Sequence, residues 1–410
     1  MNILYIVPNP PSLVRVRPYN LIRHLRARGN RVTIATVWVN AGEHADVERL
    51  RADGFEVMAA PLSKQQIALN LLRALVAGTP LQAEYSWQPD LKSQISNLPP
   101  YRGPSGKSQF DVIHVEHLRG ARYGVEIKSS ISNLRSPIPV VWDSVDCITY
   151  LFEQASRQSQ SASGQLMTWF ELGRTRRHEG WLVSQFDQVL VTSATDKAAL
   201  ERLARQQSAI SVLPNGVDLE YFTPGEDIRQ PETVVFSGKM SYHANVTAAL
   251  YLAHQVMPLV WAQQPGIRLI IAGSRPSPAV RKLAETYPQV EVTGYLSDLR
   301  APLRQVSVAA APLLYGAGIQ NKILEAMACS TPVVASPLAV SALQVQPGQD
   351  CLVANSPQTF AEAILTLLND PALRGRVGAA GRRYVETHHD WNTIAAQLES
   401  IYEQSIRNVQ

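Results

Sequence analysis

Short apolar runs alternate with amphipathic stretches along most of the chain. Near the N-terminus, the run ILYIVP is followed by a Pro-rich break and then by RPYNLIRHLRARG, whose apolar residues recur at helical spacing. The next run, RVTIATVWV, has the composition of a buried strand. Strand, loop, helix and strand in this order predict the start of a parallel α/β sheet, because parallel strands require a crossover connection.

The alternation continues through the first 210 residues. Further strands are predicted at GFEVMAAPL, FDVIHVEH, IPVVWDSVD and DQVLVTS, with helices at QQIALNLLRALVAG and MTWFELGRTRRHEGWLVSQF. Residues 156–164 are rich in Ser and Gln and predict a mobile loop. Together these elements indicate one doubly wound domain.

A turn signal separates this region from a second one. In VLPNGVDLEYFTP, residues 212–224, the pair Asn215-Gly216 suits the positive φ angles of a turn. Beyond it, helices such as HANVTAALYLAHQVMPLVWAQ and FAEAILTLLND alternate with strands predicted at TVVFSG, IRLIIAG, VEVTGY, TPVVAS and CLVA. Two successive α/β regions of similar size predict two doubly wound, Rossmann-like domains that face one cleft.

Length and composition agree with this division. A chain of 410 residues is too long for one ordinary hydrophobic core, so two domains are expected. A content of 45% hydrophobic and 18% charged residues is typical of a globular protein. No apolar run approaches the roughly 20 residues that span a bilayer. The segment MNILYIVPNPP lacks the basic region of a signal peptide and predicts a buried strand. Cys147, Cys329 and Cys351 lack metal-ligand spacing, which predicts reduced thiols and a cytoplasmic location.

Positive charge is concentrated in the first half. Residues 1–210 hold 24 Lys and Arg against 18 Asp and Glu, whereas the rest holds 14 against 16. This asymmetry suits an anionic membrane surface or a lipid diphosphate, and a solvated helix face is the alternative. The basic stretches lack interleaved aromatic residues, which argues against nucleic acid. Six arginines are clustered near the N-terminus: Arg15, Arg17, Arg23, Arg26, Arg28 and Arg31.

The stretch GAGIQNKILEAMA, Gly316 to Ala328, combines a glycine-rich turn with an amphipathic helix. Glycines leave backbone amides free to approach a ligand, and a helix N-terminus carries a partial positive charge. Lys322 and Glu325 project from neighbouring points of the helix. We expect the amides and Lys322 to bind a diphosphate and Glu325 to accept hydrogen bonds from sugar hydroxyls. The alternative is a surface helix with an ion pair.

Polar residues and glycines follow most of the predicted strands. Ligands of doubly wound sheets bind outside the carboxyl ends of the strands, so these residues are the candidates for a functional site. They are Asn9, Ser12, His114, Glu116, Asp143, Asp146, Gly238, Lys239, Gly273 to Arg275 and Gly294.

Three stretches of the sequence together resemble the retaining glycosyltransferases of family 4. They are VLPNGVDLEYFTP, VVFSGKMSYHANV (residues 234–246) and GAGIQNKILEAMA. The resemblance implies two Rossmann-like domains in the GT-B architecture and transfer of a sugar from a nucleotide-diphosphate donor to a hydroxyl, with retention. The C-terminal YVETHHDWNTIAAQLESIY resembles the family's last helix, which crosses back to the first domain. The implied domains are 1–210 for the acceptor, 211–385 for the donor, and 386–410 for that helix.

The resemblance also implies roles for individual donor-side residues. Lys239, after Gly238, matches the basic residue that the family aims at the diphosphate, and Glu325 matches the second glutamate of the E-x₇-E motif, which holds the ribose hydroxyls. Ala317 replaces the first glutamate of that motif and cannot bind the sugar hydroxyls as it would. Further donor contacts are expected from backbone and side-chain groups of Gly273, Gly294, Gly316, Gly318, Ile319, Gln320 and Lys322.

In the first domain the resemblance assigns His114 and Glu116 to the acceptor side. Asp143 replaces the histidine that often follows the family's fifth strand, and Asp146 lies three residues later. We expect His114, Asp143 and Asp146 to position substrates, because in such enzymes the leaving phosphate itself can act as the base. The first loop, which faces phosphate and acceptor, corresponds to Asn9, Ser12, Arg15 and Arg17. No metal is implied, since lysines can replace the cation.

Two alternatives to a transferase are open at this point. A sugar-nucleotide epimerase of the same fold would need no acceptor groove. A non-catalytic nucleotide-sugar-binding subunit of a glycan-assembly complex would tolerate Ala317. For a transferase, a lipid-linked or polysaccharide-precursor acceptor predicts peripheral docking on the inner membrane face.

Overall fold

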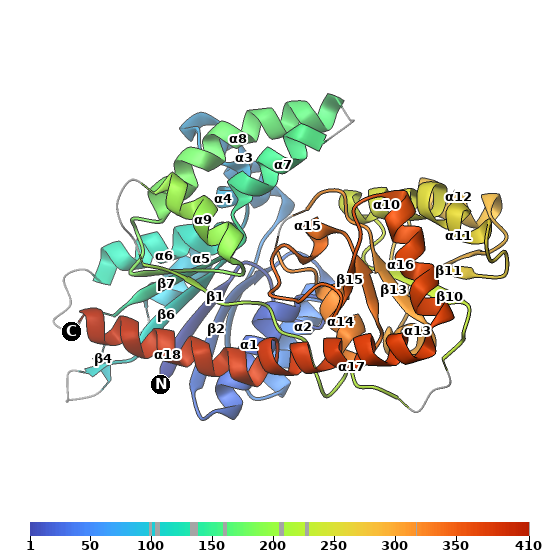
Figure 1. Cartoon of the computed structure of the whole chain (residues 1–410). Coiled ribbons are helices and arrows are strands. Elements are labelled where there is room, and N and C mark those ends of the chain that lie inside the picture. Colours follow the sequence, from blue (N-terminus) through green and yellow to red (C-terminus); the bar gives the residue numbers. More distant parts are fainter. Residues whose placement is uncertain are drawn as a thin grey trace. The chain divides into compact units, whose positions relative to one another are not determined.

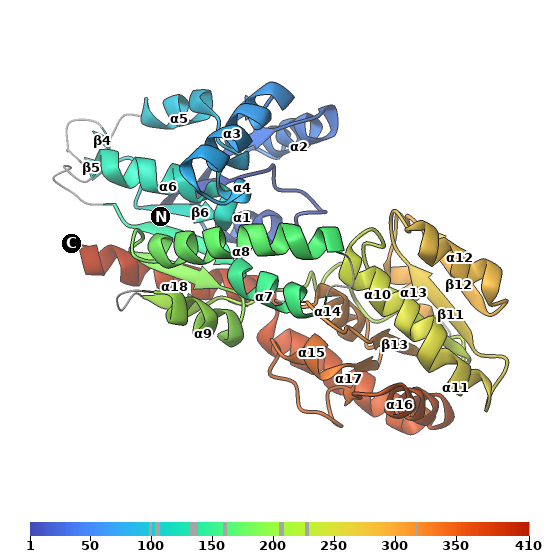
Figure 2. The same ribbon diagram turned by 90° about the horizontal axis from the view of Figure 1, so that it is seen from above.

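The computed structural model describes residues 1–97, 101–102, 107–131, 138–158, 162–204, 209–225, 229–316 and 318–409. The chain forms two compact units, Met1–Pro214 with Trp391–Gln410, and Asn215–Asp390. Each unit has a parallel sheet with helices on its faces (Figures 1 and 2). Within the described ranges, no helix combines the length and hydropathy required to cross a bilayer.

The sheet of the first unit has seven parallel strands in the order β3-β2-β1-β6-β7-β8-β9. Its strands are β1 (Asn2–Val7), β2 (Arg31–Trp38), β3 (Glu56–Pro61), β6 (Val112–Glu116), β7 (Val140–Val145), β8 (Gln188–Val191) and β9 (Ile210–Val212). A separate antiparallel pair consists of β4 (Tyr101–Arg102) and β5 (Lys107–Ser108).

Helices pack on both faces of this sheet and enclose two apolar cores. One face is covered by α1 (Val16–Ala27) and α18 (Trp391–Val409), which lie beside each other in Figure 1. The other helices of the unit are α2 (Ala41–Ala52), α3 (Lys64–Ala77), α4 (Leu81–Tyr85), α5 (Pro89–Ser96), α6 (His117–Ile131), α7 (Ile148–Gln158), α8 (Ala162–Leu182) and α9 (Ala194–Leu203).

The second unit has six parallel strands in the order β12-β11-β10-β13-β14-β15. They are β10 (Thr233–Ser237), β11 (Arg268–Ala272), β12 (Val290–Gly294), β13 (Val308–Ala311), β14 (Val333–Ala335) and β15 (Leu352–Val353). Its helices are α10 (His243–Tyr251), the π-helical segment η2 (Leu252–Val256), α11 (Met257–Trp261), α12 (Pro278–Thr286), α13 (Arg300–Gln305), α14 (Asn321–Ala328), α15 (Pro337–Val340), α16 (Pro357–Asn369) and α17 (Pro371–His388).

The two parallel, doubly wound sheets confirm the fold class predicted from the sequence. Three local predictions need correction. Helix α7 extends to Gln158 and α8 begins at Ala162, so most of the predicted loop 156–164 is helical, and residues 159–161 lie outside the described part. Buried Glu179 of α8 stabilises the start of α7 by accepting from the amides of Ile148 and Thr149 at 2.9 and 2.8 Å.

The second correction concerns the C-terminal helix. The chain is helical to His388, is not helical at His389 and Asp390, and becomes helical again at Trp391. His389 holds the break, because its ring bonds the Asn215 carbonyl at 2.6 Å and the Tyr384 hydroxyl at 3.1 Å. The predicted helix from 386 is therefore the end of α17 followed by α18.

The third correction is that the helical segment predicted from His243 to about Gln263 is not one regular α-helix. It contains the π-helical turn Leu252–Val256 between α10 and α11. Pro258 follows that turn and lacks an amide hydrogen, which accounts for the irregular hydrogen bonding there.

Candidate active site

Two glycines allow the ends of β10 and β11 to approach closely at the carboxyl edge of the second sheet. Gly238 and Gly273 follow these strands, with φ angles of 147° and 151°. A Cβ atom on Gly273 would lie 1.7 Å from the carbonyl oxygen of Gly238, so only glycine fits. The Gly238 amide donates to the Ala272 carbonyl at 3.0 Å. At Gly238 and Gly273, the edge of the sheet therefore consists of backbone atoms without side chains.

We expect Gly273→Ala to lower the free energy of unfolding by more than about 2 kcal/mol, because the added carbon combines a clash with positive φ. Gly348→Ala is the matched control, since Gly348 has a φ of 84° but a Cβ added there would meet no atom within 4 Å. That variant should cost about 1 kcal/mol. Denaturant unfolding measures both, and equal losses would mean that close backbone approach is not what requires glycine at 273.

Lys322 in the first turn of α14 lies against this glycine edge. Its Cε would be 3.3 Å from a Cβ on Gly238, and its Nζ lies 5.9 Å from the centre of the Phe236 ring. The ammonium donates to Gln320 Oε1 at 3.0 Å. Burial lowers the pKa of Lys322 to about 8, although the charge of Glu325 opposes the shift. The structure thus holds one half-buried cation beside the strand ends.

Glu325 lies one turn further along α14 and is also half-buried. Burial raises its pKa to about 7, and Lys322 opposes that shift. Within the described part of the chain, its carboxylate makes no hydrogen bond or ion pair. Lys322 and Glu325 therefore do not form the surface ion pair of the alternative interpretation, and the carboxylate retains its capacity to accept hydrogen bonds.

The loop after β10 is fixed by its backbone. The amide of Met240 donates to the Ser274 carbonyl at 2.9 Å, and Asn245 Nδ2 donates to the Lys239 carbonyl at 3.1 Å. The Lys239 side chain itself is exposed. Arg275, in the neighbouring loop, has a φ of 53°.

The glycines of the other candidate positions have left-handed or extended backbones. Gly294 ends β12 with a φ of 70°, and Gly316 and Gly318 have φ angles of 148° and 71°. Ile319 is buried and anchors the turn in the core of the unit. Ala317 lies outside the described residues, so the motif position that lacks glutamate has no structural account.

In the first unit, Arg17 and Asp143 form a buried ion pair at the carboxyl edge of the sheet. Arg17 Nε donates to Asp143 Oδ2 at 2.9 Å, and its Nη1 donates to the Pro214 carbonyl at 3.2 Å. Their side chains are 6% and 0% exposed. Burial raises the pKa of Asp143, and the Arg17 guanidinium opposes the shift. The ion pair joins the start of α1 to the end of β7.

His114 lies directly beneath this ion pair and is fully buried. Its Nδ1 shares a 2.8 Å hydrogen bond with the Tyr402 hydroxyl of α18, and its ring stacks on Tyr5 with centroids 4.2 Å apart. Its Nε2 lies 3.7 Å from Asp143 Oδ2. Burial, with a smaller contribution from Arg17, lowers the pKa of His114 well below its usual value. His114 is therefore neutral and contacts protein rather than solvent.

Glu116 ends β6 beside Asp143, in register with it. Tyr5 donates its hydroxyl hydrogen to Glu116 Oε2 at 2.9 Å. Burial and then the charge of Asp143 raise the pKa of Glu116 to about 8. A carboxyl group with this pKa carries its proton at neutral pH, so Glu116 adds no negative charge beside the Arg17–Asp143 ion pair.

The raised pKa of Glu116 predicts a pH dependence of stability. The folded state binds this proton more tightly than the unfolded state, so stability from Glu116 is present below about pH 4.5 and is lost as pH rises through about 8. Glu116→Gln should remove this loss and unfold at a higher temperature relative to wild type at pH 8 than at pH 5. Thermal unfolding across this range tests it, and parallel curves would show that Glu116 ionises normally.

Asp146 follows β7 and belongs to a different group of contacts. It accepts from Thr192 Oγ1 at 3.2 Å, and burial followed by repulsion from Asp196 raises its pKa to about 6. Between Asp143 and Asp146, Val145 has a φ of 68°, which is strained for a β-branched residue. Asp143 therefore lies within β7 and Asp146 directly after it, and the two acids have different hydrogen-bond partners.

The loop after β1 contains the remaining candidates. Ser12 is buried and its carbonyl accepts from the Arg15 amide at 2.9 Å, which closes the loop. Arg15 contacts Glu43 at 2.5 Å and the Pro10 carbonyl at 3.3 Å. Asn9 is half-buried. Of the wider arginine cluster, Arg17, Arg28 and Arg31 pair with Asp143, Glu399 and Glu56, so these arginines do not form one free basic surface.

Two family models cover both units of the chain. A model described as "Glycosyl transferase 4-like domain" matches residues 14–216, and one described as "Glycosyl transferases group 1" matches residues 231–370. The chain belongs to glycosyltransferase family 4. The second model covers all six strands of the second sheet, and the first covers the strands of the first sheet after β1. The gap between the two matches begins at the turn that separates the units.

Curated relatives of this glycosyltransferase include mannosyltransferases. One, from Corynebacterium glutamicum, is a "GDP-mannose-dependent monoacylated alpha-(1-6)-phosphatidylinositol monomannoside mannosyltransferase", 26% identical over 62% of this chain and 71% of its own. Another, from Mycolicibacterium hassiacum, is an "MMP alpha-(1->4)-mannosyltransferase", 29% identical over 59% of this chain and 61% of its own. These two matches thus span 71% and 61% of the relatives' length.

Solved structures share the fold across nearly the whole glycosyltransferase. Sucrose-phosphate synthase from Thermosynechococcus elongatus aligns with a TM-score of 0.69 at 20% identity and covers 98% of each chain. Anabaena HepE, solved in complex with UDP and glucose, aligns with a TM-score of 0.65 at 16% identity and covers 98% of this chain and 100% of its own.

Sequence reasoning missed Tyr5 and Tyr402 as members of the buried polar group around His114. Both tyrosines occupy apolar-facing positions of a strand and an amphipathic helix, where an aromatic residue ordinarily packs in a core. Their hydroxyl groups become informative only after the fold brings β1, β6 and α18 together. The sequence contains no spacing signal for them, since Tyr402 is 288 residues from His114.

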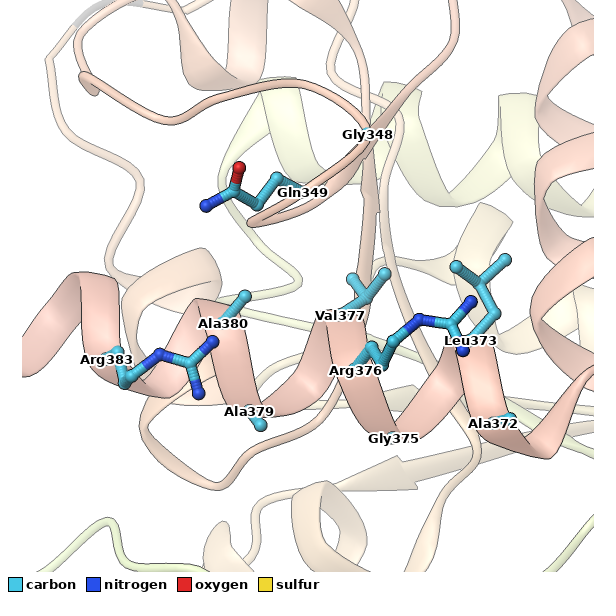
Figure 3. Close-up of a pocket in the computed structure, with 10 residues that line it drawn as sticks. All are labelled: Gly348, Gln349, Ala372, Leu373, Gly375, Arg376, Val377, Ala379, Ala380 and Arg383. Atoms are coloured by element: carbon cyan, nitrogen blue, oxygen red, sulfur yellow. The ribbon is translucent and has the colours of Figure 1, made fainter.

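A groove of about 700 Å³ lies elsewhere on the second unit (Figure 3). It is lined by α17, including Arg376 and Arg383, and by Gly348 and Gln349 of the loop that precedes β15. A loop that precedes a parallel strand lies at the amino edge of the sheet, opposite the edge of Lys322. The groove is therefore separate from the candidate donor site.

Proposed function

We propose that this glycosyltransferase moves a hexosyl group from a nucleotide-diphosphate sugar to a hydroxyl of a lipid-linked or polysaccharide-precursor acceptor, with retention. The observation that carries the donor assignment is the position of Lys322, half-buried against the Gly238–Gly273 edge at the start of α14. A fixed cation and backbone amides at a helix start are suited to a diphosphate. Glu325, whose carboxylate makes no hydrogen bond or ion pair within the described residues, suits the ribose hydroxyls.

In the proposed reaction, the bond between the anomeric carbon and the β-phosphate oxygen breaks while a bond to the acceptor oxygen forms on the same face of the sugar. The acceptor proton passes to the departing phosphate, which leaves as a nucleoside diphosphate. Lys322 stabilises the negative charge that develops on that phosphate, and exposed Lys239 can approach it from the neighbouring loop. We include in the proposal that these cations act without a metal ion.

GDP-mannose is the first donor to test, because the name of the Corynebacterium relative specifies it. Thermal unfolding with GDP, UDP, ADP and dTDP identifies the base, since a ligand that binds the folded state raises the unfolding temperature. The matching nucleotide sugar is then incubated with a phosphatidylinositol mannoside acceptor, and NMR of the product reports the anomeric configuration.

These measurements separate the proposal from its alternatives. A transferase releases nucleoside diphosphate only with acceptor and gives a product of unchanged anomeric configuration. An epimerase would change the sugar without acceptor. Binding without turnover of any donor and acceptor pair would favour a non-catalytic subunit and overturn the transferase assignment.

A further inference from the structure

Helix α3 presents its apolar side chains to the outside of the first unit. Leu69, Leu72 and Val76 recur at helical spacing and are 50%, 58% and 84% exposed, and Leu75 beside them is 44% exposed. Figure 2 shows α3 on the outer side of the unit, beside α4. Four exposed aliphatic residues within one 14-residue helix require an explanation other than the core.

The inner face of α3 packs in the ordinary way. Asn70 and Ala74 are buried, Leu71 is half-buried, and Ile67 packs against an apolar core of the unit. Asn70 Nδ2 also donates to the Trp87 carbonyl at 2.7 Å. The helix is thus attached through its inner residues, and its exposed aliphatic side chains on the outer side take no part in that packing.

We propose that the outer face of α3 docks on an anionic lipid surface. The charges of the helix, Lys64 and Arg73, are both positive, and KQQIALNLLRALVA contains no acid. Aliphatic residues with flanking cations are typical of helices that lie in a bilayer interface. A protein partner fits less well, because leucine and valine are under-represented among residues that dominate protein interfaces.

The position of α3 in the fold places the first turn of this helix at the acceptor edge, and the exposed aliphatic residues follow along the helix away from that edge. The helix begins three residues after the end of β3, so its N-terminus lies at the same sheet edge as Glu116 and Asp143. The loop after β1 adds two exposed apolar residues at this edge, Leu13 and Val14, which are 72% and 89% exposed. With two strand spacings between β1 and β3, their ends are about 10 Å apart. The inference rests on the proposed function in one respect: docking on a lipid surface would bring the enzyme to a lipid-linked acceptor.

Vesicle flotation tests the proposal on the full chain without donor or acceptor. We expect wild type to float with phosphatidylcholine vesicles that contain phosphatidylglycerol, and less with phosphatidylcholine alone. Leu72→Gln/Val76→Gln should weaken partitioning into the anionic vesicles at least about tenfold, because two aliphatic side chains leave the interface while glutamine preserves the helix. Trp181→Gln is the matched control: Trp181 is 44% exposed near the other end of α8 in the same unit. It should bind as wild type.

Equal flotation of wild type and the double variant would overturn the proposal. So would a wild-type dimer in light scattering that dissociates in the double variant while neither binds vesicles, since α3 would then be a self-association face. Transfer to a soluble acceptor analogue should be unchanged in the double variant. Vesicle binding without transfer activity would reject the proposed function but retain the docking surface, so the two failures are distinguishable.

Discussion

Lys322→Ala should reduce kcat by about 100-fold or more, while the affinity for nucleoside diphosphate falls by less than tenfold. A cation that contacts the phosphate mainly when its negative charge develops stabilises the transition state more than the bound donor. The half-buried position against Gly238 strengthens this effect, because the ammonium is fixed and partly removed from water. Steady-state kinetics and calorimetry of nucleoside diphosphate binding separate the two quantities.

Lys282→Ala is the matched control, because Lys282 is an exposed lysine on α12 of the same unit. It should behave as wild type. The pKa of about 8 for Lys322 also predicts that kcat/KM of the wild type falls as pH rises through about 8, where the ammonium loses its proton. Wild-type kcat in Lys322→Ala would show that the leaving phosphate is stabilised elsewhere.

The positions of the candidate donor residues in the fold were largely predictable from the sequence, whereas their role in donor binding stays a prediction. Gly238, Gly273, Lys322 and Glu325 are local signals, because each lies directly after a strand or within the first turns of a helix, and the carboxyl-edge rule brings such positions together. The alternation of strands and helices likewise predicted two doubly wound sheets, since parallel strands with crossover helices have few possible arrangements.

The acceptor side was less predictable. His114 and Asp143 were expected to follow strands, but they lie within β6 and β7. Their burial could not be predicted either, since the covering helix α18 comes from the other end of the chain. The buried ion pair of Arg17 was also not predicted, because an arginine that lies near other arginines in the sequence has the pattern of an exposed basic surface. Its partner Asp143 is 126 residues away. An ion pair or hydrogen bond between elements that are distant in the sequence produces no periodic pattern from which it could be predicted.

The outward leucines of α3 illustrate the same limit. Hydrophobic periodicity predicts the helix, but it does not identify which side of the helix packs inward. Here both sides of α3 carry aliphatic residues, and only the folded unit provides the contacts that mark the inner side, such as the packing of Ile67 on the core and the hydrogen bond from Asn70 to the Trp87 carbonyl.

Arg17→Met should lower the free energy of unfolding of the first unit by about 3–5 kcal/mol. The substitution leaves Asp143, which is 0% exposed, as a buried charge without its partner, and the cost of that charge outweighs the apolar contacts that methionine gains. For a unit of this size, each kcal/mol corresponds to about 2–4 °C, so the unfolding temperature should fall by roughly 10 °C.

Arg31→Met provides the matched control, because Arg31 forms an exposed pair with Glu56 at 3.0 Å in the same unit. Exposed pairs contribute about 0–1 kcal/mol, so this variant should differ little from wild type. In Arg17→Met/Asp143→Asn the unpaired charge is absent, and most of the lost stability should return. A single Arg17→Met variant as stable as Arg31→Met would mean that Asp143 is already protonated in the fold. Recovery of stability without recovery of turnover in the double variant would instead assign the ion pair a role in positioning the acceptor edge.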